Sequence, residues 1–239
     1  MRDIDIERRL MPNTYVKQLA QELGHPEALT AGTGIAPADL EHYDRPVTVA
    51  QHLRMLGNAT PLAPGRDWYL RWGQRMGEHF HGPVSIAWLC APTLGDGFDV
   101  FLKYIPGRVP YLHWQGHIEQ DRFVAEISEL MGLGRLRPML VEVPMLVMHE
   151  YVRTLRPGSI AGARVELAYP APADTSAYFR WFQCPVVFGA SRNALVFPRQ
   201  WRDMANAGFD EAMWEAACNR CKTLCGGPEE RDTLTLVRH

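Results

Sequence analysis

The sequence has no excess of positive charge. Its 25 lysines and arginines are matched by 27 aspartates and glutamates, so the formal net charge is −2. A chain that holds DNA by itself needs a net basic surface that neutralises phosphates and releases counterions. We therefore predict that any contact with DNA is made through another segment or partner.

Long apolar runs are also missing. No stretch reaches the roughly 18 apolar residues that cross a bilayer, and the most apolar segment, Met139 to Met148, contains Glu142 and Pro144. The first five residues mix charges and lack the apolar core of a signal peptide. Five cysteines, an odd number without a secretory leader, indicate a reducing compartment and not a disulfide framework. These absences predict a soluble, cytoplasmic protein with no membrane partner.

Motifs of catalysis are absent as well. The sequence contains no G-x-S-x-G, no H-E-x-x-H and no Walker loop, and its carboxylates are scattered. An enzyme acting in an aromatic pocket would need convergent acid and base groups, which the sequence does not display. We predict that the chain is not an enzyme.

Helical signals dominate the first hundred residues, where caps, apolar spacing and stop residues agree. The predicted helices run from Asn13 or Thr14 to Gly24, from Thr48 with Gln51 in a capping box, from Tyr69 to Phe80 before Gly82-Pro83, and from Thr93 with Asp96 to Pro106.

Strand-like alternation begins after Pro106. The predicted elements are a hairpin of residues 109–114 and 123–127, a long helix over 140–155, a strand over 163–169, a helical turn over 178–182, a hairpin of 186–188 and 195–197, and a helix over 209–225. Pro144 fits the long helix only if it lies in the first turn.

The resulting fold class is α+β. We predict an N-terminal helical part over residues 1–106, and then, over 107–201, a mainly antiparallel sheet of four or five strands with a helix packed across it. C-terminal helices follow over 202–239. The strongest candidate boundary is the glycine- and proline-containing stretch from Gly226 to Arg231.

Several stretches carry a family resemblance. They are Tyr169-Pro170-Ala171-Pro172, the segment Phe182-Gln183-Cys184-Pro185-Val186-Val187-Phe188-Gly189-Ala190, the segment Asn193 to Pro198, and the turn Gly32-Thr33-Gly34-Ile35. Together they resemble the N-terminal arabinose-binding domain of AraC-type transcription regulators, in the branch with the ornithine-utilisation regulators. The resemblance runs from about Tyr15 to Trp201.

The resemblance implies that residues 1–106 and 107–201 are the two parts of one effector domain, which senses a small molecule. Family members continue into a DNA-binding module with two helix-turn-helix units. Nothing after Gly226 supplies that module, so we expect residues 202–239 to lead to it and DNA to be contacted only through it. We do not infer arabinose as the effector.

Aromatic residues supply the candidate effector site. Tyr69, Trp72 and His79 lie near one helix face, and Tyr111 and His113 share a strand face. If those faces meet, they enclose a mostly apolar pocket between helices and sheet, with polar groups to orient a ligand. The alternative is that these residues form an ordinary core.

A stripe of Trp214, Cys218, Cys221 and Cys225 follows the last predicted helix at spacings of four, three and four residues. It could be a metal or cluster site, a buried face of small hydrophobes, or a surface that meets its counterpart in a dimer. Regulators of this kind read paired half-sites, so we expect a homodimer and take the stripe as its candidate surface.

Histidines offer an alternative function, a haem- or metal-binding sensor domain. The pairs His79/His81 and His113/His117 are the most metal-like features, and His149 on an apolar helix could be a haem ligand. On a continuous strand His113 and His117 lie about 13 Å apart, too far to share one ion. We predict no metal site and no cofactor.

Overall fold

The computed structural model of the chain describes residues 3–41, 45–63, 65–78, 82–156 and 158–225. Its helices are α1 (Asp3–Glu7), α2 (Thr14–Leu23), α3 (Pro26–Thr30), α4 (Val49–Ala59), α5 (Asp67–Glu78), α6 (Pro83–Leu89), α7 (Leu94–Tyr104), α8 (Arg137–Leu155), α9 (Ser176–Phe182) and α10 (Glu211–Cys225). Short 3-10 segments are η1 (Pro37–Glu41), η2 (Ile105–Gly107), η3 (Gly134–Leu136) and η4 (Arg199–Asp203). The strands are β1 (Leu10–Met11), β2 (Val47–Thr48), β3 (Leu112–Glu119), β4 (Arg122–Glu129), β5 (Arg164–Leu167), β6 (Val186–Phe188) and β7 (Asn193–Pro198).

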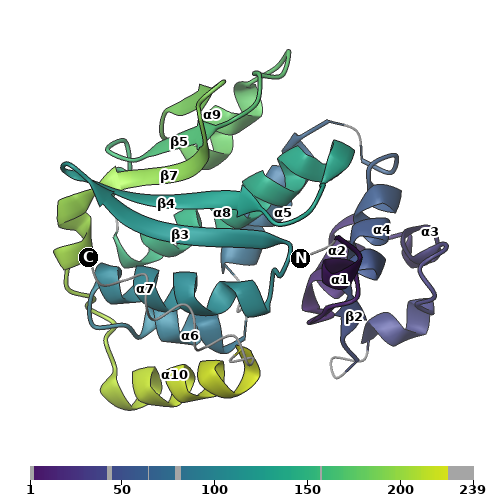
Figure 1. Cartoon of the computed structure of the whole chain (residues 1–239), viewed down its shortest axis with the longest axis horizontal. Helices are drawn as coiled ribbons and strands as arrows, with labels where there is room; N and C mark the ends of the chain where they lie inside the picture. Colours follow the sequence, from purple (N-terminus) through teal and green to yellow (C-terminus); the bar gives the residue numbers. More distant parts are fainter. Residues whose placement is uncertain (1–2, 42–44, 64, 79–81, 157, 226–239) are drawn as a thin grey trace.

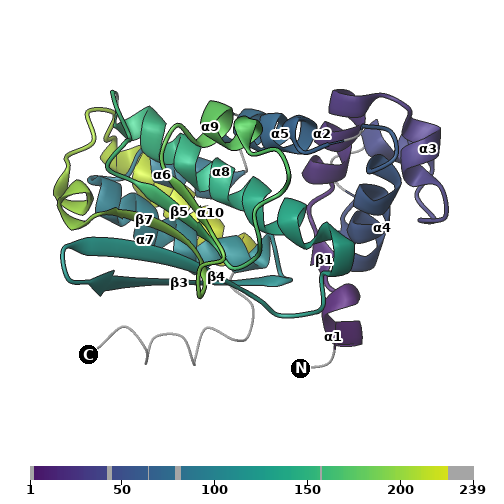
Figure 2. The same ribbon diagram turned by 90° about the horizontal axis from the view of Figure 1, so that it is seen from above.

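The first elements form a helical lobe at one end of the molecule (Figure 1, purple to blue). We use "lobe" for α1 to α4 with the short antiparallel pair β1–β2, and "body" for the described residues from 65 onward. The body holds the large sheet and the helices α5 to α10. Figure 2 shows the lobe beside the body and not across its sheet. The helices predicted within residues 1–106 are therefore shared between the two, because α5, α6 and α7 pack in the body.

The body confirms the predicted α+β class, with a five-stranded sheet in the order β3-β4-β7-β5-β6. All neighbouring pairs are antiparallel except β5 with β6. Aromatic rings join α7 to one face of the sheet: Phe98 lies 4.6 Å from Phe123 and 5.2 Å from Phe197 between ring centroids. The long helix α8 packs on α5 and reaches β7, so the core lies between these helices and the sheet.

The predicted hairpin of residues 186–188 and 195–197 is wrong. Both strands exist, but β5 lies between them, antiparallel to β7 and parallel to β6. The chain after β6 bonds back onto the end of β5, where the amide of Ala190 donates to the carbonyl of Leu167 at 3.0 Å. Gly189 and its neighbours thus form a crossover and not a two-strand turn.

The first predicted hairpin exists, with shifted limits. The strand β3 begins at Leu112 and runs through Gly116 to Glu119, whereas the prediction began the strand at Val109 and placed Gly116, together with Glu119 to Asp121, in the connection. A Cβ atom at Gly116 would lie 2.5 Å from Leu102 Cδ1 of α7. Glycine at this position therefore lets α7 pack closely against β3, and the chain does not turn there.

Pro144 does not lie in the first turn of its helix, as the prediction required. The helix α8 begins at Arg137, with Pro138 in the first turn and Pro144 inside. Proline has no N–H, so the carbonyl of Leu140, four residues earlier, lacks its usual helical donor. The surrounding packing keeps the helix intact in spite of this loss.

Two glycines allow α5 and α8 to lie unusually close together. A Cβ atom built at Gly73 would lie 3.3 Å from Leu146 Cβ, and one at Gly77 would lie 2.5 Å from Glu150 Cβ. Because real Cβ atoms do not approach at 2.5 Å, the two helices can keep this spacing only with glycine at position 77.

We expect Gly77→Ala to destabilise the protein by about 1–3 kcal/mol, because an added methyl in a tight helix contact forces the backbones apart. Gly57→Ala is the matched control, since Gly57 is also inside a helix and the nearest neighbour of its added Cβ would be Arg135 Nη2 at 3.7 Å. That control should be neutral or more stable by up to about 1 kcal/mol, owing to the better helix propensity of alanine. Urea unfolding of both variants measures the difference, and equal stabilities would contradict the close-packing argument.

Candidate functional site

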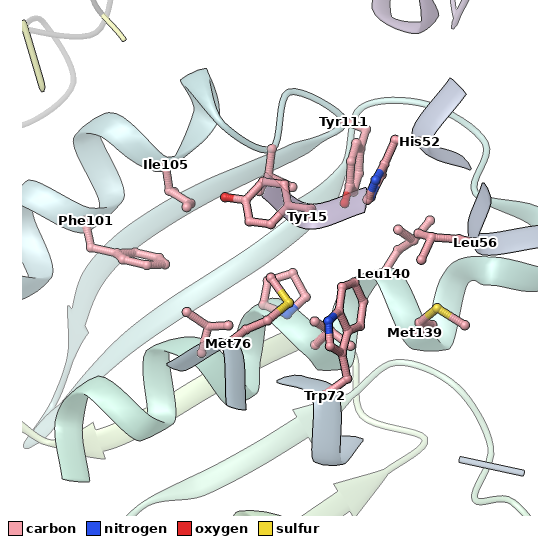
Figure 3. A pocket seen from close by; sticks show the side chains of 14 residues that line it. Tyr15, His52, Leu56, Trp72, Met76, Phe101, Ile105, Tyr111, Met139 and Leu140 are labelled. Carbon is pink, nitrogen blue, oxygen red and sulfur yellow. The ribbon is translucent and has the colours of Figure 1, made fainter. Parts of the chain in front are cut away.

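A cavity of about 40 Å³ lies between the lobe and the body. In Figure 3, Tyr15 of α2 and His52 of α4 in the lobe face Trp72 and Met76 of α5, and residues of α7 and α8 complete the wall. Its lining is made of Tyr15, His52, Leu56, Trp72, Met76, Phe101, Ile105, Val109, Tyr111, Met139, Leu140, Val143, Pro144 and Val147. Both parts of the chain are needed to close it.

The helix α8 provides one continuous wall. Leu140, Val143, Pro144 and Val147 recur at the three- and four-residue spacing of one helix face. In Figure 3 the rings of Tyr15, Tyr111 and His52 lie opposite Trp72. Among the described residues, no aspartate, glutamate, lysine or arginine belongs to the lining, so this lining is apolar with a few aromatic polar atoms.

Two of those polar atoms lack a hydrogen-bond partner among the described residues: His52 Nδ1 and Trp72 Nε1. His52 is 2% exposed and Trp72 is 4% exposed. A buried polar atom left unpaired costs about 1–3 kcal/mol. Both atoms belong to residues that line the same cavity, so a bound molecule with a polar group is the natural partner for them.

Burial lowers the pKa of His52 from 6.5 to about 4. The imidazole is therefore neutral at neutral pH. It is packed between two phenol rings, with centroid distances of 6.2 Å to both Tyr15 and Tyr111, and it stacks nearly parallel to Tyr111 at 19°. The position and charge of this ring are thus set by the aromatic residues around it.

Tyr15 is held from behind by a buried arginine. Arg108 Nε donates to the Tyr15 hydroxyl oxygen at 3.1 Å, and the guanidinium carbon lies 5.5 Å from the centre of the Tyr15 ring. Arg108 is 7% exposed and does not line the cavity. The guanidinium of Arg108 therefore holds Tyr15 in place and does not face the cavity.

Trp72 and Met76 also border a groove on the outside of the protein. The groove is lined by these two residues and by Gln18, Gln21, Glu22 and Arg75. Ion pairs hold α2 to α5 at this groove: Glu22 Oε1 lies 2.8 Å from Arg71 Nη2, and Glu22 Oε2 lies 2.5 Å from Arg75 Nη1. The side chains of Trp72 and Met76 therefore separate the cavity from a polar, outward-facing groove.

A second polar centre surrounds Glu142, which is 0% exposed on α8. Its Oε1 accepts from the hydroxyls of Tyr169 at 2.7 Å and Tyr178 at 2.8 Å and from Arg66 Nη1 at 3.0 Å. Its Oε2 accepts from the hydroxyl of Tyr69 at 2.9 Å. Burial raises the pKa of Glu142, while the four donors act in the opposite direction.

The Glu142 cluster is a structural cross-link. Arg66 precedes α5, Tyr69 is on α5, Tyr169 follows β5 and Tyr178 is on α9, so one carboxylate joins four segments. Arg66 also donates to the hydroxyls of Tyr69 and Tyr178. Each group therefore has a partner, and the cluster has no open ligand position among these contacts.

The structure places only some of the predicted site residues in the cavity. Trp72 and Tyr111 line the cavity together, but Tyr69 points to Glu142 instead. His113 is exposed on β3, whereas Tyr111 is buried just before that strand, so the two do not share a strand face. His79 lies outside the described residues.

Tyr15 and His52 of the lobe are the polar cavity residues that the sequence analysis did not predict. The sequence does contain a pattern that points to His52. This residue lies inside the capped helix α4, on the same buried face as Val49, Met55 and Leu56. A titratable residue in such an apolar stripe indicates a buried polar group that needs an explanation.

The stripe on α10 packs largely against its own chain. Cys221 is 0% exposed, and Trp214 and Cys218 are partly buried against the core. The helix packs on α6 and α7 of the same chain, because this stripe is its apolar face. Cys221 is therefore not exposed to a partner copy, the dimer surface through Trp214 and Cys218 stays a prediction, and the side chain of Cys225 lies outside the described part of the chain.

Within the described ranges, no three histidine, cysteine, aspartate or glutamate side chains come together in a way that could hold a metal ion. His149 is buried on α8, with its ring 5.7 Å from that of Phe182. The metal and haem alternative gains no geometric support from these residues. None of the helices in the described ranges combines the length and the hydropathy that a membrane crossing requires.

A mostly apolar cavity between two parts of an α+β domain is typical of a small-molecule-binding domain. Residues 24–206 match the family described as the arabinose-binding domain of AraC transcription regulators, N-terminal. The chain belongs to this family, and the resemblance inferred from the sequence is confirmed.

Two similar proteins come from Pseudomonas aeruginosa. An ornithine utilization regulator is 27% identical over 169 residues, which are 70% of this chain and 49% of the regulator. The crystal structure of the transcriptional regulator CdpR shares 18% identity with a TM-score of 0.50, covering 74% of this chain and 64% of CdpR. The chain spans about half the length of the first relative, and the likeness to CdpR supports the fold.

Proposed function

We propose that this chain is the effector-sensing part of an AraC-type transcription regulator. A small molecule binds in the cavity between lobe and body, and its presence controls a helix-turn-helix module of the regulator. The observation that carries this proposal is the composition of the cavity wall, which comes from both the lobe and the body. Family membership and the two regulators among the similar proteins support the same class of function.

A ligand shifts a conformational equilibrium only if it binds one arrangement better than the other. A molecule in this cavity touches the lobe through Tyr15 and His52 and the body through Trp72 and α8. It therefore favours one particular spacing of lobe and body. The ion pairs of Glu22 with Arg71 and Arg75 hold the same two parts together in the arrangement seen here.

The helix α10 offers a route for the signal. Phe101 of α7 and Ile105 of η2 line the cavity, and α10 packs on both α7 and η2. A movement of the cavity wall can therefore reach α10, the last described helix, through α7 or η2. The proposed route rests on this continuous packing.

We also propose that the regulator acts as a homodimer, because regulators of this kind read paired half-sites. Since the cysteine-containing face of α10 packs against its own chain, we expect a contact through that helix to use its outer face. Met213 and Leu224 are about half exposed there. Light scattering of the wild type and of a Met213→Glu, Leu224→Glu double variant tests this: a dimer that becomes monomeric supports the outer face, and an unchanged dimer excludes it.

The effector site is tested by thermal-shift screening of sugars, amino acids, aromatic acids and fatty acids. A specific ligand at a hundredfold excess over Kd stabilises the chain by about 2.7 kcal/mol, which raises Tm by roughly 5–10 °C. Val143→Phe fills the cavity and should abolish the shift. Val187→Phe makes the same change at a position that is 43% exposed and should keep it. If no compound stabilises the wild type more than Val143→Phe, the cavity is not the effector site.

A further inference from the structure

We infer that the effector is an uncharged, largely apolar molecule whose polar end, a hydroxyl or neutral amide, is recognised by Trp72 and His52. This inference rests on the proposed function and names the chemical class of the ligand. It excludes amino acids, carboxylic acids and amines in their ionised forms. The argument has three parts: the charges around the cavity, the unpaired nitrogens inside it, and its size.

In the part of the chain that the structure describes, the charged groups next to the cavity point elsewhere. Arg108 holds the hydroxyl of Tyr15 from behind, and Glu142 is enclosed by three phenols and Arg66. Glu22 and Arg75 lie on the outer side of Trp72 and Met76, where they bind each other. An ionised ligand in the cavity would lose its hydration without gaining a counter-charge, which is among the most unfavourable steps in binding.

The unpaired nitrogens specify what a neutral ligand must offer. The indole Nε1 of Trp72 carries a hydrogen and only donates, so it requires an acceptor oxygen or nitrogen. The Nδ1 of a neutral imidazole donates or accepts according to its tautomer. A hydroxyl or a neutral amide both donates and accepts and can therefore satisfy either nitrogen.

Size and access indicate that part of the wall moves. A water molecule needs roughly 10–15 Å³ and a benzene-sized ligand about 150 Å³ of such space, so a cavity of about 40 Å³ is smaller than any ring-shaped effector. Trp72 and Met76 are the residues shared with the outer groove. Methionine is flexible and adapts to new shapes, so this pair is the part of the wall that can give way.

The test compares probes that have the same size and differ in charge. Benzyl alcohol, benzoate and benzylammonium form one set, and 1-butanol, butyrate and butylammonium form a smaller one. Each is titrated to millimolar concentration into the ¹⁵N-indole-labelled chain. The Trp72 resonance is assigned by its loss in Trp72→Phe. Trp114 is an internal control, because its buried Nε1 is also unpaired but does not line the cavity.

We expect the alcohols to shift the Trp72 resonance while the Trp114 resonance stays in place. The ionised members of each set should shift it at least tenfold less. His52→Phe keeps the aromatic ring and should weaken binding of the alcohols about three- to tenfold, the effect of one hydrogen bond. That variant retains the Trp72 signal, so the result does not depend on a cavity-filling substitution.

The outcomes separate this inference from the proposed function. If benzoate, butyrate or an ammonium compound shifts Trp72 more than the matching alcohol, the site binds ligands and the inferred class is wrong. If no member of either set shifts Trp72 more than Trp114, the cavity takes no small molecule, and the proposed function fails together with the inference.

Discussion

Acidification from pH 7 to pH 4 is expected to remove about 3 kcal/mol of stability through His52 alone. Burial lowers the pKa of His52 from 6.5 to about 4, and each pKa unit corresponds to about 1.4 kcal/mol. Between those two values the unfolded chain binds a proton that the folded chain does not. Stability is therefore complete above pH 6.5 and falls as the pH drops toward 4.

The surroundings of His52 explain why its protonation should cost so much stability. Tyr15 and Tyr111 pack against its ring, and the nearest described cation behind Tyr15 is Arg108. None of these groups carries the negative charge that would balance an imidazolium. A protonated His52 would be a buried charge without a counter-ion, which is strongly unfavourable.

His52→Phe isolates the effect, because phenylalanine retains a ring next to Tyr111 and does not titrate. Urea unfolding of both proteins at several pH values gives the difference in stability as a function of pH. The comparison is necessary because burial raises the pKa of Glu142. For that carboxyl the folded chain holds the proton longer, so its contribution falls as the pH rises through its ordinary value, with the opposite sign. A pH-independent difference between wild type and variant would show that His52 is not buried as a neutral ring.

Glu142→Ala is expected to cost about 3–5 kcal/mol, the usual loss when one partner of a buried ion pair is removed. Four donors would lose their acceptor at once: Arg66 and the phenols of Tyr69, Tyr169 and Tyr178. Arg66 is 28% exposed and can turn partly to water, but the phenols cannot. Removal of a single donor by Tyr169→Phe should cost less, about 1.5–3 kcal/mol.

Asp99→Asn is the control for loss of an arginine-paired carboxylate at the surface. Asp99 is 62% exposed and bonded by Arg202 at 2.8 Å. An exposed pair of this kind contributes at most about 1 kcal/mol. Urea unfolding at neutral pH compares the three variants. A cost for Glu142→Ala similar to that for Asp99→Asn would mean that the cluster is hydrated and does not tie α5 to α8, β5 and α9.

The helix starts show how far local rules reach. The capping boxes of Thr48 with Gln51 and of Thr93 with Asp96 were predicted from three-residue spacings and are present with both hydrogen bonds. These bonds join residues that are neighbours in the chain, so sequence alone specifies them. The helix α6 was missed because Gly82-Pro83 was interpreted only as a stop, although proline is equally suited to a first helical turn.

The candidate site was predicted only in part, for a related reason. Trp72 and Tyr111 were chosen as aromatic residues at the right periodicity, and both line the cavity. Tyr69 has the same character and lies three residues from Trp72, yet its hydroxyl binds Glu142. The three-residue spacing of Tyr69 and Trp72 does not tell which of them faces the cavity. That depends on where the lobe, with α2 and α4, packs against α5.

Composition and local spacing were enough to predict the α+β class, the capped helix starts at Thr48 and Thr93, and the family. These properties depend on composition or on contacts within a few residues along the chain. Three features depend on the packing of distant segments: β5 lies between β6 and β7, Glu142 accepts from four side chains, and His52 and Trp72 line one cavity with nitrogens that have no partner among the described residues. Each of these depends on segments far apart in the chain, whose approach is governed by the packing of the whole core and not by any local pattern.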